Sequence, residues 1–213
     1  MLMQKERELI VEFGKKMSNA GLCPGTSGNL SILDRQSGYM AISPSGIDYF
    51  ATTPNDVVIL DLGENVIDGC RKPSSEASLH AEFYKKKLNI SAVVHTHSIY
   101  CTAFAVLNMP LKAVHFAIGS AGAPEVPCAP YCLFGSKELA HTAPEYCKDS
   151  NAVLLANHGI VCCGADISSA FSLAENMEYV AKLQYLAMSV GTPQLISDSE
   201  IVKVLERFKS YGQ

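Results

Sequence analysis

The sequence predicts one α/β domain in which helices cover a mixed or largely antiparallel sheet. Three observations predict it: amphipathic helical segments alternate with short apolar strands, hairpin-like strand pairs occur near the amino end, and no linker, repeat or low-complexity tract divides the chain. Helices between strands normally cover the faces of a sheet, whereas hairpins make neighbouring strands antiparallel. The length of 213 residues suits a single domain with a sizeable core.

The amino-terminal part is predicted to hold a helix followed by strands. Apolar residues recur at helical spacing over 4–20, and Gly21 is a suitable stop. A Gly-rich loop at 25–29 then leads into a hairpin. The expected strands run to Leu33, over 39–42 and over 57–61.

The rest of the chain alternates buried strands with helices. A helix is expected to begin at Ser74 or Ser75, either of which is a natural N-cap, and to run to about Leu88. The apolar run 92–94 reads as a strand. Further strands are expected at 112–118 and 152–156, and further helices up to about Leu107, at 136–147, at 166–190 and at 197–209.

Composition argues against several classes of protein. The net charge is −4, and Lys and Arg form no basic stripe, so nucleic acid is not an expected partner. No apolar stretch reaches the length of a membrane span, and the charged amino terminus does not resemble a secretory signal. The eight irregularly spaced cysteines then read as reduced thiols, which predicts a cytoplasmic protein.

Three histidines and a glutamate form a candidate metal site. His95 and His97 lie two apart in a strand-like context, so both imidazoles should point to the same face. His158 follows a second buried strand, and Glu76 begins a predicted helix. Three imidazoles and one carboxylate suit Zn²⁺, although another divalent metal could serve. The other histidines, at 80, 115 and 141, show no such pattern and read as ordinary surface or core residues.

Three short loops rich in hydroxyl groups and glycine are candidate anion sites. They are 25–29, 43–46 and the pair 74–75. Such loops present N–H and O–H donors to a phosphate without needing a lysine. None is a Walker A motif or a dinucleotide fingerprint, so nucleotide binding is not favoured. Because the third loop directly precedes Glu76, phosphate and metal would lie within the length of one small substrate.

In this order, the motifs match a known family. They are Gly-Thr-Ser-Gly-Asn (25–29), Ser-Pro-Ser-Gly (43–46), Lys-Pro-Ser-Ser-Glu (72–76), His-Thr-His (95–97) and Asn-His-Gly (157–159). The chain resembles the class II aldolase/adducin-head family, and within it the bacterial L-fuculose-1-phosphate aldolases. The segments 127–131, 134–135 and 208–212 are also similar to that subgroup, so the resemblance implies one class II aldolase domain over 1–213.

The resemblance implies a three-layer α/β/α sandwich around a mainly antiparallel sheet, assembled as a homotetramer with active sites between subunits. It also implies zinc on Glu76, His95, His97 and His158. The residues it implies for phosphate binding are Thr26, Gly28, Asn29, Ser45, Gly46, Ser74 and Ser75.

The implied activity is reversible cleavage of a ketose 1-phosphate to dihydroxyacetone phosphate and a small aldehyde such as L-lactaldehyde. Glu76 would move the proton at C3 of dihydroxyacetone phosphate. One position departs from the pattern: where the fuculose-phosphate enzymes carry a tyrosine that serves the aldehyde oxygen, this chain has Phe116. Tyr211, which matches a second family tyrosine, could compensate, or the site could prefer a less polar aldehyde, as in relatives acting on 5-deoxyribulose or 5-methylthioribulose 1-phosphate.

Other activities of the family stay open at this point. They are 4-epimerisation of a pentulose phosphate, and dehydration or decarboxylation of a phosphorylated sugar acid or methylthio sugar. A non-catalytic interaction module like the adducin head is the rival from a different class. That rival predicts loss of the metal ligands, and all four are present in this chain.

Overall fold

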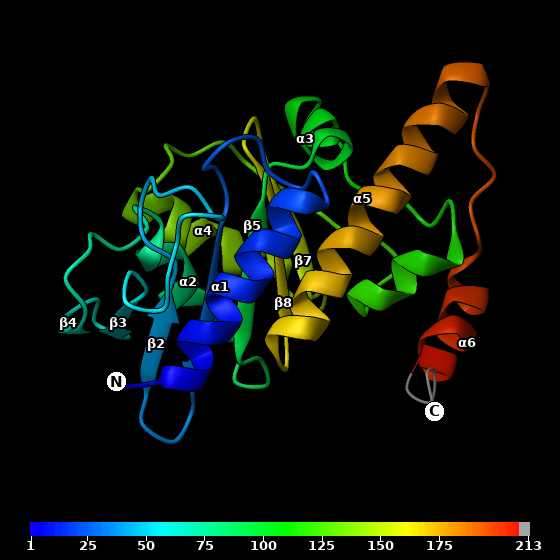
Figure 1. The fold of residues 1–213 in the computed structure, drawn as a ribbon. Helices are drawn as coiled ribbons and strands as arrows, with labels where there is room; N and C mark the ends of the chain where they lie inside the picture. The colour runs from blue at the N-terminus through cyan, green and yellow to red at the C-terminus, as the bar shows by residue number, and fades with distance from the viewer. Residues whose placement is uncertain (209–213) are drawn as a thin grey trace.

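The centre of the molecule is one eight-stranded sheet, seen in a computed structural model that describes residues 1–208 (Figure 1). Its strand order is β4-β3-β2-β1-β5-β8-β7-β6. Neighbouring strands run antiparallel, except that β6 and β7 are parallel. The strands are β1 (Asn29–Asp34), β2 (Tyr39–Ile42), β3 (Val58–Asp61), β4 (Val66–Asp68), β5 (Ala92–Thr96), β6 (Cys128–Ala129), β7 (Ala152–Leu155) and β8 (Gly159–Gly164).

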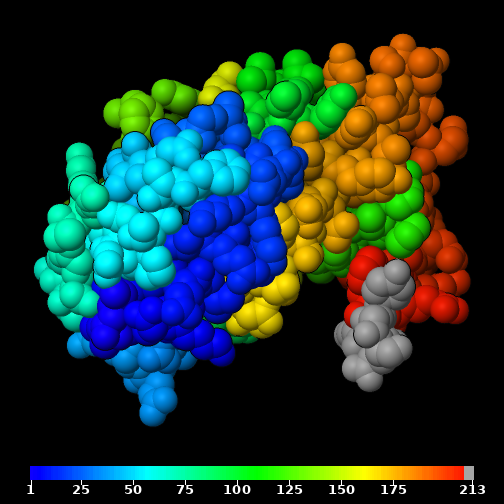
Figure 2. Space-filling view, in the orientation of Figure 1, coloured from blue at the N-terminus to red at the C-terminus, as the bar shows by residue number. Residues whose placement is uncertain are grey.

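Helices cover both faces of this sheet. One face carries α1, α3 and α5, and the other carries α2 and α4 (Figure 1). In the space-filling view α1 and α5 lie side by side, and the rings of Phe13 and Phe171 meet there edge to face at 5.4 Å (Figure 2). The helices are α1 (Gln4–Asn19), α2 (Ala77–Lys86), α3 (Ile99–Val106), η1 (Phe116–Ala121), α4 (Lys137–Cys147), α5 (Ile167–Val190) and α6 (Asp198–Phe208), where η1 is a 3-10 helix.

Two hydrophobic cores follow from the alternation of side chains along the strands. In β5, Ala92 and Val94 pack with α1, α3 and α5, whereas Val93 between them packs with α2 and α4. A strand buried on both faces is apolar at every position, which is why 92–94 reads as a continuous apolar run. The predicted three-layer sandwich with a mainly antiparallel sheet is confirmed.

The predicted strand at 112–118 is wrong. Leu111 makes only an isolated bridge with Val126, and the backbone N–H of Lys112 donates to the side-chain oxygen of Gln184 at 2.7 Å. The chain then turns into η1, where Nδ1 of His115 accepts the N–H of Ala117 at 3.2 Å. The backbone groups of this segment are thus satisfied by side chains and a tight helix instead of a neighbouring strand.

The start of α2 also differs from the prediction. Neither Ser74 nor Ser75 is the N-cap, because Glu76 holds that position and its side chain makes no capping bond. The N–H of Ser74 donates to the carbonyl of Ser43 at 3.1 Å, which ties this segment to the chain after β2 and delays the helix. No helix among residues 1–208 has the length and apolarity needed to cross a membrane.

Candidate active site

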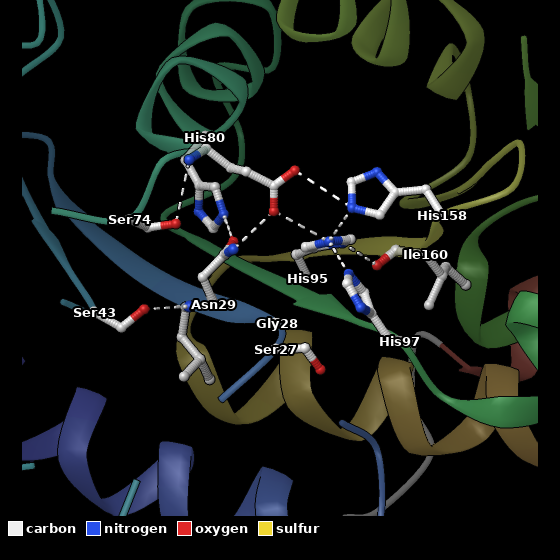
Figure 3. A network of polar contacts seen from close by, with 12 residues as sticks. Ser27, Gly28, Asn29, Ser43, Ser74, His80, His95, His97, His158 and Ile160 are labelled. Atoms are coloured by element: carbon white, nitrogen blue, oxygen red, sulfur yellow. Dashed lines mark hydrogen bonds and ion pairs between the residues drawn. The ribbon is translucent and has the colours of Figure 1, made fainter. Parts of the chain in front are cut away.

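The three predicted histidine ligands meet at one end of the central strands (Figure 3). Nε2 of His95 lies 3.0 Å from Nε2 of His97 and 3.2 Å from Nε2 of His158. All three ligand atoms lie within 4.8 Å of one another. The three side chains therefore form one compact group of ring nitrogens.

Local backbone geometry explains how these histidines converge. His95 lies in β5 and His97 follows its last residue, so the alternation along a strand turns both rings to one side. His158 lies in the turn between β7 and β8, where Asn157 adopts the left-handed conformation with φ 56°. Gly159, the residue after His158, passes so close to β5 that an added Cβ would lie 2.3 Å from the carbonyl oxygen of Thr96. The turn thereby brings His158 against β5.

Glu76, which directly precedes α2, completes the group. One carboxylate oxygen, Oε2, lies 3.3 Å from Nε2 of His95 and accepts a hydrogen bond from the amide of Asn29 at 2.9 Å. The other, Oε1, lies 3.5 Å from Nε2 of His158 and has no hydrogen-bond partner among the described residues, although it is buried. A buried carboxylate oxygen without a donor is costly, so a further positive or donating group is expected there.

The protonation states of the group suit a cation. Burial lowers the pKa of His95, of His97 and of His158, the last to about 4, so the imidazoles are neutral near pH 7. Burial acts to raise the pKa of Glu76, but His95, His158 and the Asn29 amide outweigh it and the pKa is lowered. A neutral imidazole and an ionised carboxylate are the forms that bind a metal.

A hydrogen bond fixes the tautomer of His95. Its Nδ1 lies 2.9 Å from the carbonyl oxygen of Ile160, which can only accept, so Nδ1 carries the proton. The lone pair of Nε2 therefore points into the group of ring nitrogens. Three imidazoles and the carboxylate of Glu76, whose Oε1 is buried without a hydrogen-bond partner among the described residues, together fit a divalent metal such as Zn²⁺.

A cavity of about 330 Å³ opens beside this group. Its wall includes all seven residues predicted to bind phosphate, together with Glu76, His97, His158 and Phe134. The three predicted loops, which come from distant parts of the sequence, thus share one cavity with the candidate metal ligands. Within it, the side-chain amide of Asn29 is turned toward Glu76 and His80.

Two residues of the site were not predicted from the sequence, and two residues singled out in the sequence, Phe116 and Tyr211, lie outside the cavity wall or outside the described part of the chain. Sequence reasoning assigned no role to Phe134, on the cavity wall, or to His80, a fully buried core histidine. Glu76 and His80 are four apart and so lie on one helical face, which was the available signal for His80. Phe116 begins η1 and is 53% exposed, outside the cavity wall. Tyr211 lies outside the described residues, so its role stays a prediction.

Comparison with known proteins agrees with the fold and with the family resemblance. Residues 8–185 match the family model described as Class II Aldolase and Adducin N-terminal domain. The chain is 49% identical over 213 residues, the full length of both chains, to the 5-deoxy-D-ribulose 1-phosphate aldolase of Bacillus thuringiensis serovar kurstaki. It is 38% identical over 204 residues to the L-fuculose phosphate aldolase of Escherichia coli O6:H1, covering 95% of this chain and 94% of the relative.

A solved structure is also similar. That of an L-fuculose 1-phosphate aldolase superposes with a TM-score of 0.96 at 40% identity and covers 98% of each chain. The family resemblance inferred from the motifs is confirmed. The chain belongs to the class II aldolase and adducin N-terminal domain family.

Proposed function

We propose that this class II aldolase cleaves a ketose 1-phosphate between C3 and C4, reversibly, to dihydroxyacetone phosphate and a small aldehyde. The observation that carries the proposal is the meeting of Glu76 and three histidine Nε2 atoms beside a cavity walled by the three hydroxyl-rich loops. A phosphorylated sugar needs an anion site and a polarising site within its own length. This cavity offers candidates for both.

We assign a metal, most simply Zn²⁺, to Glu76, His95, His97 and His158. When bound, a divalent cation acts as a Lewis acid on the carbonyl oxygen of the substrate and so favours proton exchange at the neighbouring carbon. The phosphate is held by backbone N–H and hydroxyl donors of the loops around Gly28, Gly46 and Ser75.

Glu76 is the group we assign to the proton at C3. In the cleavage direction the C4 hydroxyl loses its proton, the electron pair of the C3–C4 bond stays with the three-carbon fragment, and C3 then gains a proton. Glu76 lines the cavity, and its Oε1 is buried with no hydrogen-bond partner among the described residues, so this carboxylate is suited to that transfer. Tyr211 is proposed to serve the C4 oxygen.

A 5-deoxypentulose 1-phosphate is the substrate we favour over L-fuculose 1-phosphate. Cleavage of such a five-carbon ketose leaves a two-carbon aldehyde with an apolar methyl end, which a phenylalanine suits better than a tyrosine. The 49% identity to the Bacillus thuringiensis enzyme supports this choice. We further propose a homotetramer with active sites between subunits, in which the exposed Phe116 reaches a neighbouring cavity; light scattering should give four times the 22.9 kDa of one chain.

The test is a coupled assay for dihydroxyacetone phosphate release from 5-deoxyribulose 1-phosphate and from L-fuculose 1-phosphate. Release should stop with a chelator and return with Zn²⁺, and Glu76→Gln should lower kcat at least about 10²-fold. The exposed Glu175→Gln serves as the matched control. Phe116→Tyr should shift preference toward L-fuculose 1-phosphate. The proposal would be refuted if dihydroxyacetone phosphate were still released in the presence of the chelator and by Glu76→Gln. Formation of an epimerised pentulose phosphate without triose phosphate would favour another reaction of the family.

A further inference from the structure

A row of buried polar side chains runs from Glu76 into the space between β1 and α2. Figure 3 shows the part of the row that holds Asn29 and His80. Asn29 Nδ2 lies 2.9 Å from Glu76 Oε2, and Asn29 Oδ1 lies 2.5 Å from His80 Nε2. His80 Nδ1 is 2.6 Å from the hydroxyl of Ser31, which is 2.7 Å from the hydroxyl of Tyr84. All five residues are buried, and His80, Ser31 and Tyr84 are wholly so.

Two simple periodicities build this row. Asn29 and Ser31 alternate along β1 and so point to the same face of the sheet. The N-cap Glu76 and the α2 residues His80 and Tyr84 are spaced by four, so the three side chains lie on one side of this helix. Packing that helical face on that strand interleaves the two sets, so each polar group in the row meets a partner from the other element.

The donors of the row all point toward Glu76. The carboxylate can only accept, so Asn29 presents its NH₂ to Glu76 and its carbonyl oxygen to His80. His80 Nε2 must then be the donor. Burial lowers the pKa of His80 to about 3, so the ring is neutral and its Nδ1 accepts. Ser31 therefore donates to His80. The single hydroxyl hydrogen of Tyr84 is then shared between the hydroxyl of Ser31 at 2.7 Å and the backbone carbonyl of Ser31 at 2.9 Å, both of which accept.

We propose that His80 is a positioning residue, which fixes the orientation of the Glu76 carboxylate through the amide of Asn29. This inference rests on the metal and proton-transfer roles proposed for Glu76. His80 itself does not reach the cavity. Its N–H prevents the Asn29 amide from turning over and facing Glu76 with its oxygen, and so it holds Oε2 while Oε1 stays available.

Four variants test the inference through metal affinity, measured by competition between the protein and a chromogenic zinc chelator. His80→Leu removes the donor that orients Asn29, the hydrogen-bond partner of Glu76. It should weaken zinc binding by up to about 10- to 100-fold, the usual effect of losing such a partner of a metal ligand. His80→Gln keeps one donor and one acceptor and should restore most of the affinity. Ser31→Ala, which leaves Nδ1 without a donor, should give a smaller loss, and would carry the test should His80→Leu fail to fold.

Phe83→Leu is the matched control, because Phe83 is a fully buried apolar residue of the same helix that packs in the core with α4 and makes none of the hydrogen bonds of the row. It should lower the melting temperature without weakening zinc binding. A second readout separates positioning from general damage: for His80→Leu, kcat should fall more than KM rises. The variant frees only the side-chain amide of Asn29 and leaves the backbone N–H and hydroxyl donors of the phosphate loops in place. The inference would be overturned if His80→Leu and Ser31→Ala bound zinc as tightly as Phe83→Leu does. This holds even if the wild type is a fully active aldolase. A wild type that releases no triose phosphate would instead refute the proposed function, while the order of zinc affinities would still decide the role of His80.

Discussion

At the scale of single residues, two glycines let the neighbouring strands approach the His-Thr-His segment closely. An added Cβ on Gly28 would lie 2.7 Å from the carbonyl oxygen of His95, and one on Gly159 would lie 2.3 Å from that of Thr96. Real Cβ atoms do not come so near a carbonyl, so a side chain at either position would push a strand away. Gly159 therefore sets how closely the turn that carries His158 approaches β5. Gly28 sets how closely β1, whose Asn29 bonds to Glu76, approaches β5.

Gly159→Ala should accordingly damage the metal site more than an ordinary glycine replacement. The clash with the Thr96 carbonyl must displace the turn that carries His158, so we expect zinc affinity to fall by tenfold or more and the melting temperature to drop. Gly191→Ala is the matched control, because Gly191 has an extended backbone at φ 171° and open space around its Cα. Equal zinc affinities for the two variants would contradict this role of Gly159.

The candidate ligands could be predicted from the sequence because each depends on local geometry. His95 and His97 share a face through strand alternation, and His158 follows a buried strand. The partners of Glu76 could not be predicted in the same way. Asn29 and His80 are 51 residues apart, and their contact depends on which face of α2 packs on which strand. Each periodicity is visible in the sequence, but the pairing of the two is a property of the folded chain.

Asp56 should make the stability of the protein depend on pH in acid. Hydrogen bonds from Thr53 and then from Arg71 lower the pKa of Asp56 from 3.8 to about 2. A lowered folded-state pKa contributes stability above pH 3.8, and this contribution is lost as the pH falls toward 2. Asp56→Asn should therefore unfold more easily than wild type near pH 6, with the difference narrowing below pH 4.

Urea unfolding of metal-free protein between pH 3 and 6 measures this difference, in which the other titrating groups largely cancel. Arg71→Gln is the informative control. This variant leaves in place both hydrogen bonds from Thr53 to Asp56, which include the largest cause of the lowered Asp56 pKa. Arg71→Gln should therefore lose less stability than Asp56→Asn. A difference between Asp56→Asn and wild type that stays constant over this range would contradict the assignment.

At the scale of elements, α3 is capped by a residue from another helix. α3 begins two residues after His97, and its N-cap, Ser98, makes no side-chain capping bond. Instead the carboxylate of Glu178, in α5, accepts the backbone N–H groups of Tyr100 and Cys101, each at 2.9 Å. A negative charge at a helix amino terminus also interacts favourably with the helix dipole. Glu178 thus ties α5 to the helix that continues from the candidate site.

Glu178→Ala should lower the free energy of unfolding by about 1–2 kcal/mol, because it leaves two amide groups at the start of α3 without their acceptor. Glu178→Gln, which keeps one acceptor, should lose less. Glu175→Ala, one turn earlier on the exposed side of the same helix, should change stability by less than about 0.5 kcal/mol. Chemical unfolding of the three variants checks this order, and equal losses for Glu178→Ala and Glu175→Ala would rule out the cap.

The elements predicted well are those with a strong period or a continuous apolar run, such as α1, β5 and α5. The segment 112–118 was misread as a strand because its apolar residues contact the α5 side of the sheet from a loop and a 3-10 helix. β8 was not predicted, because its first residue closes the turn that begins at Asn157 and the sequence signalled only that turn. For 112–118 the partner of the backbone, Gln184, is distant in sequence. β8 pairs with the adjacent β7 on one side and with the distant β5 on the other.

At the scale of the whole molecule, the candidate ligands link the half of the sheet that holds β5, β8 and β7 to the helical layer of α2. Glu76 precedes α2, His95 and His97 belong to the β5 segment, and His158 lies between β7 and β8. In the unfolded chain these groups are far apart, so a metal that needs all four binds the folded state almost exclusively. Binding must then stabilise the entire fold by mass action.

Zinc at about 100 times its dissociation constant should therefore stabilise the folded protein by about 2.7 kcal/mol. Calorimetry should show a higher melting temperature with zinc than with a chelator, and His97→Ala should lose most of that increment, because it removes one ligand. His141→Ala, which removes an exposed histidine of α4, should keep it. An increment that survives His97→Ala but is lost in His141→Ala would place the stabilising metal elsewhere on the molecule, since surface histidines also bind zinc.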